Sequence, residues 1–274
     1  MTTRESQLTN VESLNAVGVG PIQRCVGVLR LLSSAGGRGM ALTSIAQRTA
    51  LAPSTVHRLL AQMARERLVQ QNEETRCYGL GPLAFEIGLA AAKQFDQRSR
   101  YRPVLEQLAL DAGDTAYCIL RSGSEAVCAD MVEGPSPIRV VTLAIGSRRP
   151  LGLGAGGLAI LAWLPEQERE AILQTVLPEI KSDWPQAEFA LHKSIDEARS
   201  VGYAMIHNRV SPGISALGVP FKDASGRAIG ALSVAAVDKR IGGSRLGVLA
   251  QLLNRAVRQV EREMRARPAQ LQNS

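Results

Sequence analysis

The chain has 274 residues, of which 45% are hydrophobic and 21% charged, and its formal net charge is +7. This length is enough to bury a sizeable core in one large domain or two ordinary ones, which excludes a chain that is disordered throughout. Its longest apolar runs are far shorter than the roughly 20 residues that a helix needs to cross a bilayer, so we expect no contact with a membrane. No secretory leader opens the chain and its four cysteines form no CxxC pair, which favours a reduced, cytoplasmic protein.

The positive charge is concentrated near the amino terminus. Residues 24–69 contain seven arginines, no lysine and a single acid, Glu66, which gives this segment a net charge of +6. A basic excess confined to one short segment is typical of a surface that attracts a polyanion such as nucleic acid. Residues 1–20 and 268–274 are polar and lack periodicity, and we expect both to be disordered tails.

Residues 21–81 predict three helices and a hairpin. Apolar side chains recur at helical spacing over residues 22–34, and the sequence AGGRG then ends the first helix. A second, short helix is predicted to start at a cap formed by Thr43 or Ser44 and to end near Thr49.

The third predicted helix lies within residues 51–69 and has two faces of different chemistry. Pro53 suits its first turn, and Ser54 is a possible cap. Its apolar stripe, at i, i+3, i+4 and i+7, consists of Val56, Leu59, Leu60 and Met63. An extended segment, the turn QQNEET and the returning RCYGL follow as a hairpin. This order of elements is the layout of a winged helix-turn-helix.

The polar face of the third helix is suited to DNA. A helix that lies in the major groove needs short donors and acceptors at its amino end and cations along its flanks. Arg58 is suited to bind guanine through two hydrogen bonds, whereas the other arginines are better placed for phosphates. The residues expected to contact double-stranded DNA are Arg38, Thr43, Ser54, Thr55, His57, Arg58, Arg65 and Arg76. The alternative is an ordinary solvated face, which the turn, the wing and the acid-poor flanks disfavour.

Residues 42–88 carry a family resemblance. They read LTSIAQRTALAPSTVHRLLAQMARERLVQQNEETRCYGLGPLAFEIG. This stretch resembles the DNA-binding half of the IclR family of bacterial transcriptional regulators, whose pattern is roughly L-S-E-I-A-x-x-T-G-L-P-K-S-T-V-H-R-L-L, followed by a wing that ends in Y-x-L-G. The match is continuous over residues 54–60. It departs at Ala50, Ala52 and Pro53, where the family usually has Gly, Pro and Lys.

A linker helix is predicted over residues 82–98. Its sequence LAFEIGLAAAKQF is apolar on two sides, and such a helix must be covered on both. Helix-turn-helix modules commonly bind two half-sites about one DNA turn apart, so we expect a homodimer or a homotetramer.

Residues 99–267 change to an α+β pattern. Helices are predicted over residues 102–113, 157–164 and 188–201 and from about 243, and strands near 115–121, 126–132, 138–145, 214–221 and 228–236. Short strands followed by helices and further strands favour a sheet with helices packed on it rather than a strict βαβ repeat.

The resemblance extends into this second region. RRPLGLGAGGLAILAWLP, residues 148–165, looks like the family segment P-L-H-x-T-A-x-G-K-A-x-L-A, and residues 202–241 look like the family's carboxyl-terminal signature. The match therefore covers about residues 21–265. It implies a GAF-like effector-binding domain, and with it a DNA-binding regulator that is not an enzyme and needs no cofactor.

The resemblance also implies positions for the effector. Family members that bind small oxo-acids use the backbone of the glycine loop, an Asp, a Cys and two Ser. On this sequence the corresponding positions are Ala155, Gly156, Ile206, Ala216, Ser233 and Ala235. Apolar residues thus replace three polar groups: Ile206 stands for the Asp, Ala216 for the Cys and Ala235 for the second Ser. We expect a larger or aromatic effector, with a possible anionic end; the alternative is that the alanines are only core residues.

The glycine loop at residues 152–157 offers a rival interpretation. Its glycines spell G-x-G-x-x-G before a helix, which is the fingerprint of a dinucleotide-cofactor enzyme. That fingerprint needs a strand running directly into the loop and an acid at the end of the next strand, and neither is evident here. Glycines that enter a helix still present bare N–H groups, which suit a carboxylate.

Other candidate sites are weaker. His192 and His207 have no companion ligands at metal-binding spacing, so we expect no metal. The serines lie in no G-x-S-x-G elbow, which disfavours a hydrolase. Cys118 and Cys128 fall inside apolar strands and are expected to pack rather than react.

Overall fold

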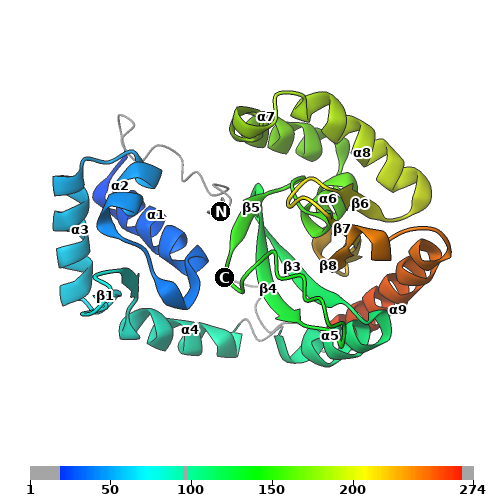
Figure 1. Cartoon of the computed structure of the whole chain (residues 1–274), viewed down its shortest axis with the longest axis horizontal. Helices are drawn as coiled ribbons and strands as arrows, with labels where there is room; N and C mark the ends of the chain where they lie inside the picture. Colours follow the sequence, from blue (N-terminus) through cyan, green and yellow to red (C-terminus); the bar gives the residue numbers. More distant parts are fainter. Residues whose placement is uncertain (1–18, 95–97, 267–274) are drawn as a thin grey trace. The chain divides into compact units, whose positions relative to one another are not determined.

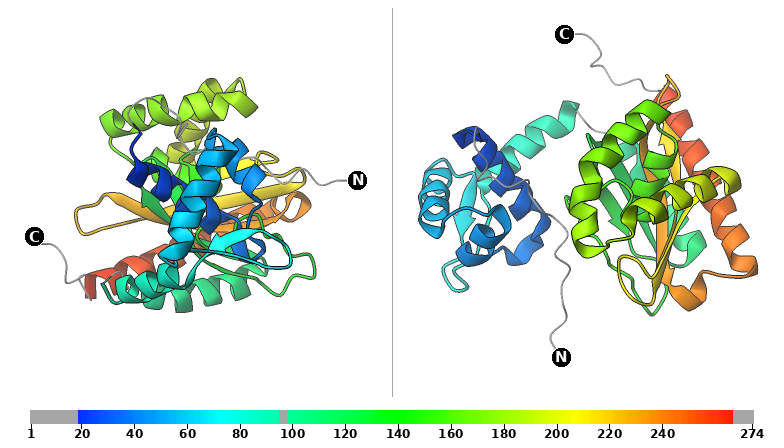
Figure 2. Two further views of the ribbon diagram at one scale, coloured as in Figure 1. Left: turned by 90° about the vertical axis from the view of Figure 1, so that its left-hand side faces the viewer. Right: turned by 90° about the horizontal axis from the view of Figure 1, so that it is seen from above.

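The structure is a computed structural model that describes residues 19–94 and 98–266 (Figures 1 and 2). It divides into two compact units, Met1–Phe95 and Asp96–Ser274. The predicted tails, except residues 19 and 20, and the predicted linker residues 95–97 lie outside the described residues. Within the described ranges, no helix is long and apolar enough to cross a membrane.

The first unit is a winged helix-turn-helix. Its elements are α1 (Pro21–Ser34), η1 (Gly36–Arg38), α2 (Leu42–Thr49), α3 (Pro53–Arg65), β1 (Val69–Gln71), β2 (Tyr78–Leu80) and α4 (Pro82–Gln94). Strands β1 and β2 pair in antiparallel register, and Met40 adds an isolated bridge to Tyr78. The predicted three helices and hairpin are therefore confirmed.

One small core holds these elements together. The buried stripe of α3 packs with apolar residues of α1 and α2 and with Val69 and Tyr78 of the wing. Val56 and Leu60 are fully buried, because the i, i+4 spacing places both on the same face of α3. The opposite face of α3 is left in solvent.

Both predicted helix caps are wrong. Helix α2 has Ala41 at its N-cap, one residue before the helix begins, and no side chain caps it. Helix α3 has Ala52 at its N-cap, so Ser54 lies inside the first turn. Pro53 explains the start of α3, because its fixed φ and missing N–H suit the first helical position.

Helix α4 begins on the wing. The N–H of Gly81 donates to Leu68 O (2.8 Å), and the N–H of Leu83 donates to Arg67 O (3.0 Å). The Arg67 side chain also forms an ion pair with Glu86 of α4 (2.9 Å). The predicted linker helix therefore belongs to the first unit as far as Gln94. Arg98, predicted as the last linker residue, is instead the first residue of the next helix.

The second unit is an antiparallel sheet covered by helices on both faces. Its elements are α5 (Arg98–Ala112), β3 (Thr115–Ser122), β4 (Glu125–Val132), β5 (Arg148–Pro150), α6 (Ala155–Ala162), α7 (Glu166–Asp183), α8 (Ala187–Val201), β6 (Ala204–His207), β7 (Ile214–Lys222), β8 (Ala228–Val237), η2 (Asp238–Arg240) and α9 (Ser244–Ala266). The strand order is β5-β4-β3-β8-β7-β6, and every neighbouring pair is antiparallel. The predicted α+β class is confirmed.

The two faces of the sheet carry different helices. Helices α5 and α9 pack on one face through a continuous apolar core with β3, β7 and β8 (Figure 1). Helix α6 lies on the other face against β7 and β8, and α8 packs on α6. All eight residues of α6 are buried, as expected of a helix that is apolar all round.

A buried carboxylate ties α5 to α9. Asp114 is 2% exposed and accepts hydrogen bonds from Arg240 (3.0 Å) and Arg245 (2.5 Å). Arg245 also donates to Ala112 O (2.6 Å), the last residue of α5. The charge of Asp114 is compensated by two arginines, which is the usual condition for burying a carboxylate.

One predicted strand is wrong. Residues 139–144 form no strand or helix, although the run IRVVTLAI predicted a strand over residues 138–145. Arg139, Val141 and Ala144 are exposed, Thr142 and Leu143 are half-buried, and Val140 is buried. The short strands β5 and β6 were not predicted, because three or four residues are too few to show a period.

Candidate DNA-binding face and effector pocket

The residues predicted to contact DNA lie on the solvent-facing surface of the first unit. Thr55 is half-buried and the other seven are exposed, namely Arg38, Thr43, Ser54, His57, Arg58, Arg65 and Arg76. Ser54 shares the exposed face of α3 with His57 and Arg58 because these lie three and four residues further along the helix. Arg76 lies in the turn of the wing with a positive φ of 58°.

This surface is electrostatically open. Arg58 and Arg65 form no ion pair with the described residues. No acid lies in the first turn of α3, where the helix dipole favours anions, so a phosphate would meet no competing carboxylate there. The face can therefore accept a polyanion without first breaking internal ion pairs.

The turn that sets the angle of α3 contains a strained alanine. Ala50 follows α2 in the left-handed conformation, with φ 53° and ψ 24°. This conformation is unfavourable for residues with a Cβ, and glycine usually occupies it. The position is one of the three at which the sequence departs from the IclR pattern, and it is the one where the pattern has glycine.

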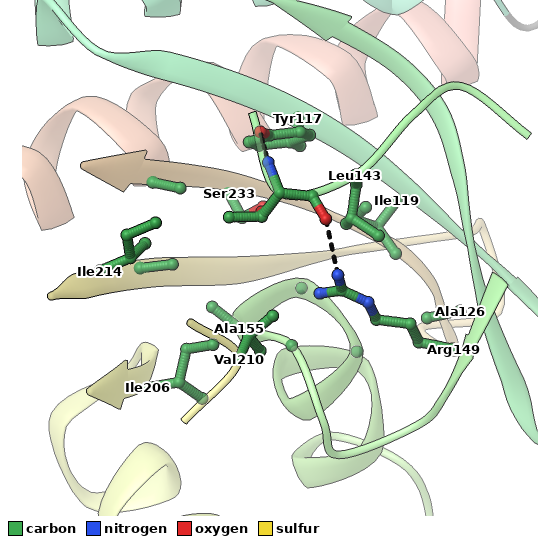
Figure 3. A pocket seen from close by; sticks show the side chains of 16 residues that line it. Tyr117, Ile119, Ala126, Leu143, Arg149, Ala155, Ile206, Val210, Ile214 and Ser233 are labelled. Atoms are coloured by element: carbon green, nitrogen blue, oxygen red, sulfur yellow. Dashed lines mark hydrogen bonds between the residues drawn. The ribbon is translucent and has the colours of Figure 1, made fainter. Parts of the chain in front are cut away.

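A pocket opens between α6 and the sheet of the second unit (Figure 3). Its empty volume is about 580 Å³, counting space that is open to solvent. The lining residues are Tyr117, Ile119, Ala126, Thr142, Leu143, Arg149, Gly154, Ala155, Gly156, Gly157, Ile206, Val210, Ile214, Ala216, Ser233 and Ala235. All six residues predicted to meet an effector are among them. They come from α6, β6, β7 and β8, and the fold brings them together.

Three polar lining residues were not predicted: Tyr117, Thr142 and Arg149. The hydroxyl of Tyr117 donates to Val140 O (2.8 Å) and accepts from the N–H of Thr142 (3.1 Å). Arg149 donates through Nη2 to Thr142 O (2.6 Å). Figure 3 draws the bonds of Tyr117 and Arg149 to Thr142 as dashed lines, with Tyr117 and Arg149 at the two ends of the chain.

Arg149 is a cation in a mostly apolar pocket. It forms no other hydrogen bond and no ion pair with the described residues. Burial lowers the pKa of its guanidinium from the usual value, although arginine stays charged at neutral pH. No signal in the sequence separated it from its neighbour Arg148, which binds Glu125 (2.7 Å) and Ser122 instead.

The glycine loop serves close packing. A Cβ at Gly156 would lie 2.6 Å from Ile119 Cγ1, and a Cβ at Gly218 would lie 2.5 Å from Ala155 O. Glycine at both positions lets α6 approach the sheet closely enough to border the pocket. The strand before the loop, β5, is a short antiparallel edge strand, so the parallel βαβ unit that dinucleotide binding requires is missing there.

His207 has companions that the sequence did not reveal. Its Nδ1 lies 2.9 Å from Ser215 Oγ and 2.8 Å from Asp238 Oδ1, and Ser215 Oγ donates to Asp238 (2.5 Å). In a hydrolase triad the histidine bridges the acid and the serine through different ring nitrogens. Here one nitrogen faces both partners and Ser215 is fully buried, so the cluster joins β6, β7 and η2 and is not a nucleophile site.

The two buried cysteines are not reactive thiols, and no metal-binding cluster occurs among the described residues. Burial raises the pKa of Cys128 to about 12 and that of Cys118 well above its usual value, so both thiols stay protonated at neutral pH. In residues 19–94 and 98–266, no group of three or more His, Cys, Asp or Glu side chains could hold a metal ion.

Known proteins resemble the chain along most of its length. The family model described as IclR helix-turn-helix domain matches residues 21–73, and the model described as bacterial transcriptional regulator IclR C-terminal matches residues 89–262. The HTH-type transcriptional regulator BhcR of Paracoccus denitrificans is 28% identical over 244 residues, which cover 89% of this chain and 86% of BhcR.

Solved structures agree with this match. An IclR transcriptional regulator from Alicyclobacillus acidocaldarius is 27% identical, with a TM-score of 0.72 that covers 89% of this chain and 98% of that one. An IclR homologue from Microbacterium hydrocarbonoxydans, complexed with 4-hydroxybenzoate, shares the fold at 20% identity and a TM-score of 0.68, over 90% of this chain and 100% of that one. The rival interpretation as a nucleotide-dependent enzyme is therefore set aside, and the chain belongs to the IclR family of bacterial transcriptional regulators.

Proposed function

We propose that the exposed face of α3 lies in the major groove of promoter DNA. Ser54, Thr55, His57 and Arg58 would then face base edges at the amino end of the helix. The flanking arginines and Thr43 would contact the phosphates, as would Arg76 from the wing. The observation that supports this orientation is the contrast between the buried stripe of α3 and its open, acid-free opposite face.

We further propose that the effector is a fairly apolar or aromatic compound with an anionic end. Ile206, Ala216 and Ala235 remove polar groups from the pocket, while Ser233 keeps one hydroxyl there. Arg149 adds a cation that pairs with no acid of residues 19–94 and 98–266, which suits a single carboxylate. The complex of the Microbacterium homologue with 4-hydroxybenzoate, an aromatic acid, supports the same ligand class.

We infer that the protein acts as a homodimer or homotetramer in the cytoplasm. Three large apolar side chains of α4 lie in solvent within the first unit: Phe85 is 67% exposed, Ile87 53% and Leu89 55%. Such a concentration of exposed apolar residues on one short helix is typical of a protein interface. Sedimentation that finds only monomer at micromolar concentration would argue against this assembly.

The effector proposal is tested by its effect on DNA binding. Labelled DNA from upstream of the gene is titrated with the protein in the presence of 4-hydroxybenzoate, benzoate, glyoxylate or pyruvate. We expect the aromatic acids to change the apparent dissociation constant, because a ligand shifts the equilibrium only if it binds two states with different affinity. Glyoxylate and pyruvate should have little effect.

A pocket variant separates the two functions. Ala235→Phe places a ring in the pocket and should abolish the response to aromatic acids while leaving DNA affinity near that of the parent protein. Tight binding of glyoxylate with inert aromatic acids would overturn the proposed effector class, although not the DNA-binding role.

A further inference from the structure

We propose that Arg149 holds the anionic group of the effector and, through Thr142, fastens residues 138–145 over the pocket, so that occupancy orders this segment. This inference rests on the proposed function of the pocket as the effector site. It adds a specific anchor and a conformational consequence to that function.

The segment is held at very few points. Among the described residues, the backbone of residues 140–143 forms hydrogen bonds only with Tyr117 and Arg149: two with the Tyr117 hydroxyl and one with Arg149 Nη2. It has no strand partner, and Val141 is 54% exposed. Backbone with so few bonds opens at low free-energy cost, so these three hydrogen bonds, together with the burial of Val140, determine how ordered the segment is.

Both side chains lie where a ligand would lie. Tyr117 and Arg149 line the pocket, as do Thr142 and Leu143 of the segment itself. Figure 3 shows Leu143 and the Arg149 guanidinium bordering the same space. A ligand whose apolar part fills the pocket would add contacts beneath Leu143, while its charge reached the guanidinium.

Arg149 has donors left for the ligand. A guanidinium has five N–H groups arranged along two edges that each fit a carboxylate. The Thr142 carbonyl takes one N–H of Nη2, which leaves one complete edge for a bidentate carboxylate. Arg149 can thus bind the anion and keep its bond to Thr142, and fixing the guanidinium also fixes the segment.

The charge balance favours this arrangement. Burial desolvates the Arg149 guanidinium and lowers its pKa, and no carboxylate of the described residues pairs with it. An anion that enters the pocket supplies the missing charge where screening by water is weak. A neutral ligand of the same shape would fill the space without this gain.

The experiment compares charged and neutral probes on matched variants. Arg149→Met removes the charge and the bond to Thr142, and Arg149→Lys keeps the charge but lacks the planar guanidinium that can bind two groups at once. Arg148→Met is the control, since it removes the neighbouring arginine, which pairs with Glu125 and does not line the pocket. The probes are 4-hydroxybenzoate, benzoate and the neutral isostere benzamide, and the readouts are calorimetry and amide hydrogen exchange over residues 138–145.

We expect the parent protein and Arg148→Met to bind benzoate and 4-hydroxybenzoate more tightly than benzamide. Saturation with either acid should slow exchange at residues 140–143 by about tenfold or more. Arg149→Met should weaken acid binding by about ten- to hundredfold, as expected when a charge-assisted pair is lost, and leave benzamide unchanged. Arg149→Lys should recover part of the acid affinity but less of the protection.

Each failure points to a different part of the proposal. Acid binding that survives Arg149→Met would overturn the anchor and leave the aromatic effector in place. Acid binding without slower exchange would overturn the coupling to the segment. The segment can also be tested without ligand, because Arg149→Met alone should speed exchange at residues 140–143 relative to Arg148→Met, and equal rates would overturn its fastening by Arg149.

Failure of every aromatic acid to bind would count against the proposed effector class. In that case acetate serves as the anion probe, and the NMR signal of Arg149 Nε–H should shift on titration. An unmoved signal would overturn the anchor as well.

Discussion

The exposed face of α3 and the interior of the second unit use charge in opposite ways. On α3, Arg58 and Arg65 lie in solvent and form no ion pair with the described residues. In the second unit, Asp114 is almost fully buried between two arginines, and Arg149 borders an apolar pocket. A charge on α3 is available to a partner, whereas the charge of Asp114 is part of the fold.

This difference makes the two regions separable by substitution. Removing a charge from α3 should weaken DNA binding and leave the free energy of unfolding almost unchanged, because exposed charges contribute little to stability. Removing the buried charge of Asp114 should do the reverse. A substitution that changed both DNA affinity and the free energy of unfolding would show that the two regions do not use charge differently.

The largest expected effect follows the removal of Asp114. Asp114→Ala leaves Arg240 and Arg245 without their carboxylate and should lower the free energy of unfolding of the second unit by about 3 kcal/mol. Urea denaturation with a probe in that unit measures the loss. Asp111→Ala is the control, because within the described part of the chain that exposed carboxylate bonds only Gln107 of its own helix, and its loss should cost less than about 0.5 kcal/mol. Equal losses in the two variants would show that burial of Asp114 is not what makes it structural.

Arg58→Ala should have the largest effect on DNA. If Arg58 binds a base edge, specific affinity should fall by about 1 to 3 kcal/mol, or roughly 5- to 150-fold, with relaxed preference at one base pair. The melting temperature should stay close to that of the parent protein, since Arg58 is exposed. Arg30→Ala, which removes an exposed arginine from α1, is the matched control and should retain operator affinity. An unchanged operator affinity for Arg58→Ala would place Arg58 outside the interface.

The helix face and the pocket also differ in how far their residues could be predicted from the sequence. The face of α3 is a local property, because helical periodicity alone separates Leu59 and Leu60 from His57 and Arg58. The six positions transferred from the family pattern all line the pocket, although they lie on four different elements. A pattern of residues along one helix, or along a known fold, can therefore be found without coordinates.

The missing residues depended on the fold. Tyr117, Thr142 and Arg149 meet only because β3, the segment after β4, and β5 come together in the second unit. Residues 138–145 read IRVVTLAI and predicted a strand, but in the structure the backbone of residues 140–143 is bonded by the side chains of Tyr117 and Arg149 and not by a neighbouring strand. The predicted serine cap of α3 was wrong for a local reason, because Pro53 starts the helix and leaves Ala52 at the N-cap.

Ala50→Gly should stabilise the first unit. Ala50 has a φ of 53°, a conformation that costs a residue with a Cβ about 1 to 2 kcal/mol, and part of this is offset by the greater freedom of glycine in the unfolded chain. We expect a net gain of about 1 kcal/mol in the free energy of unfolding, measured by chemical denaturation. Ala61→Gly, in the exposed interior of α3, should instead lose about 1 kcal/mol. A loss in both variants would show that the turn after α2 is not strained.

The smallest effect separates a phosphate contact from a base contact. Arg65→Gln removes one cation near the end of α3, and if that cation neutralises one phosphate, the slope of log affinity against log salt should become less steep by about 0.9. Over the range from about 50 to 200 mM salt, this corresponds to a change of about threefold in how much affinity is lost. The loss should be similar for operator and unrelated DNA, because a phosphate carries no sequence information. Arg199→Gln removes the same charge from α8 of the second unit and should leave the slope unchanged; a slope that responds equally to both variants would mean that net charge, and not the face of α3, sets the salt dependence.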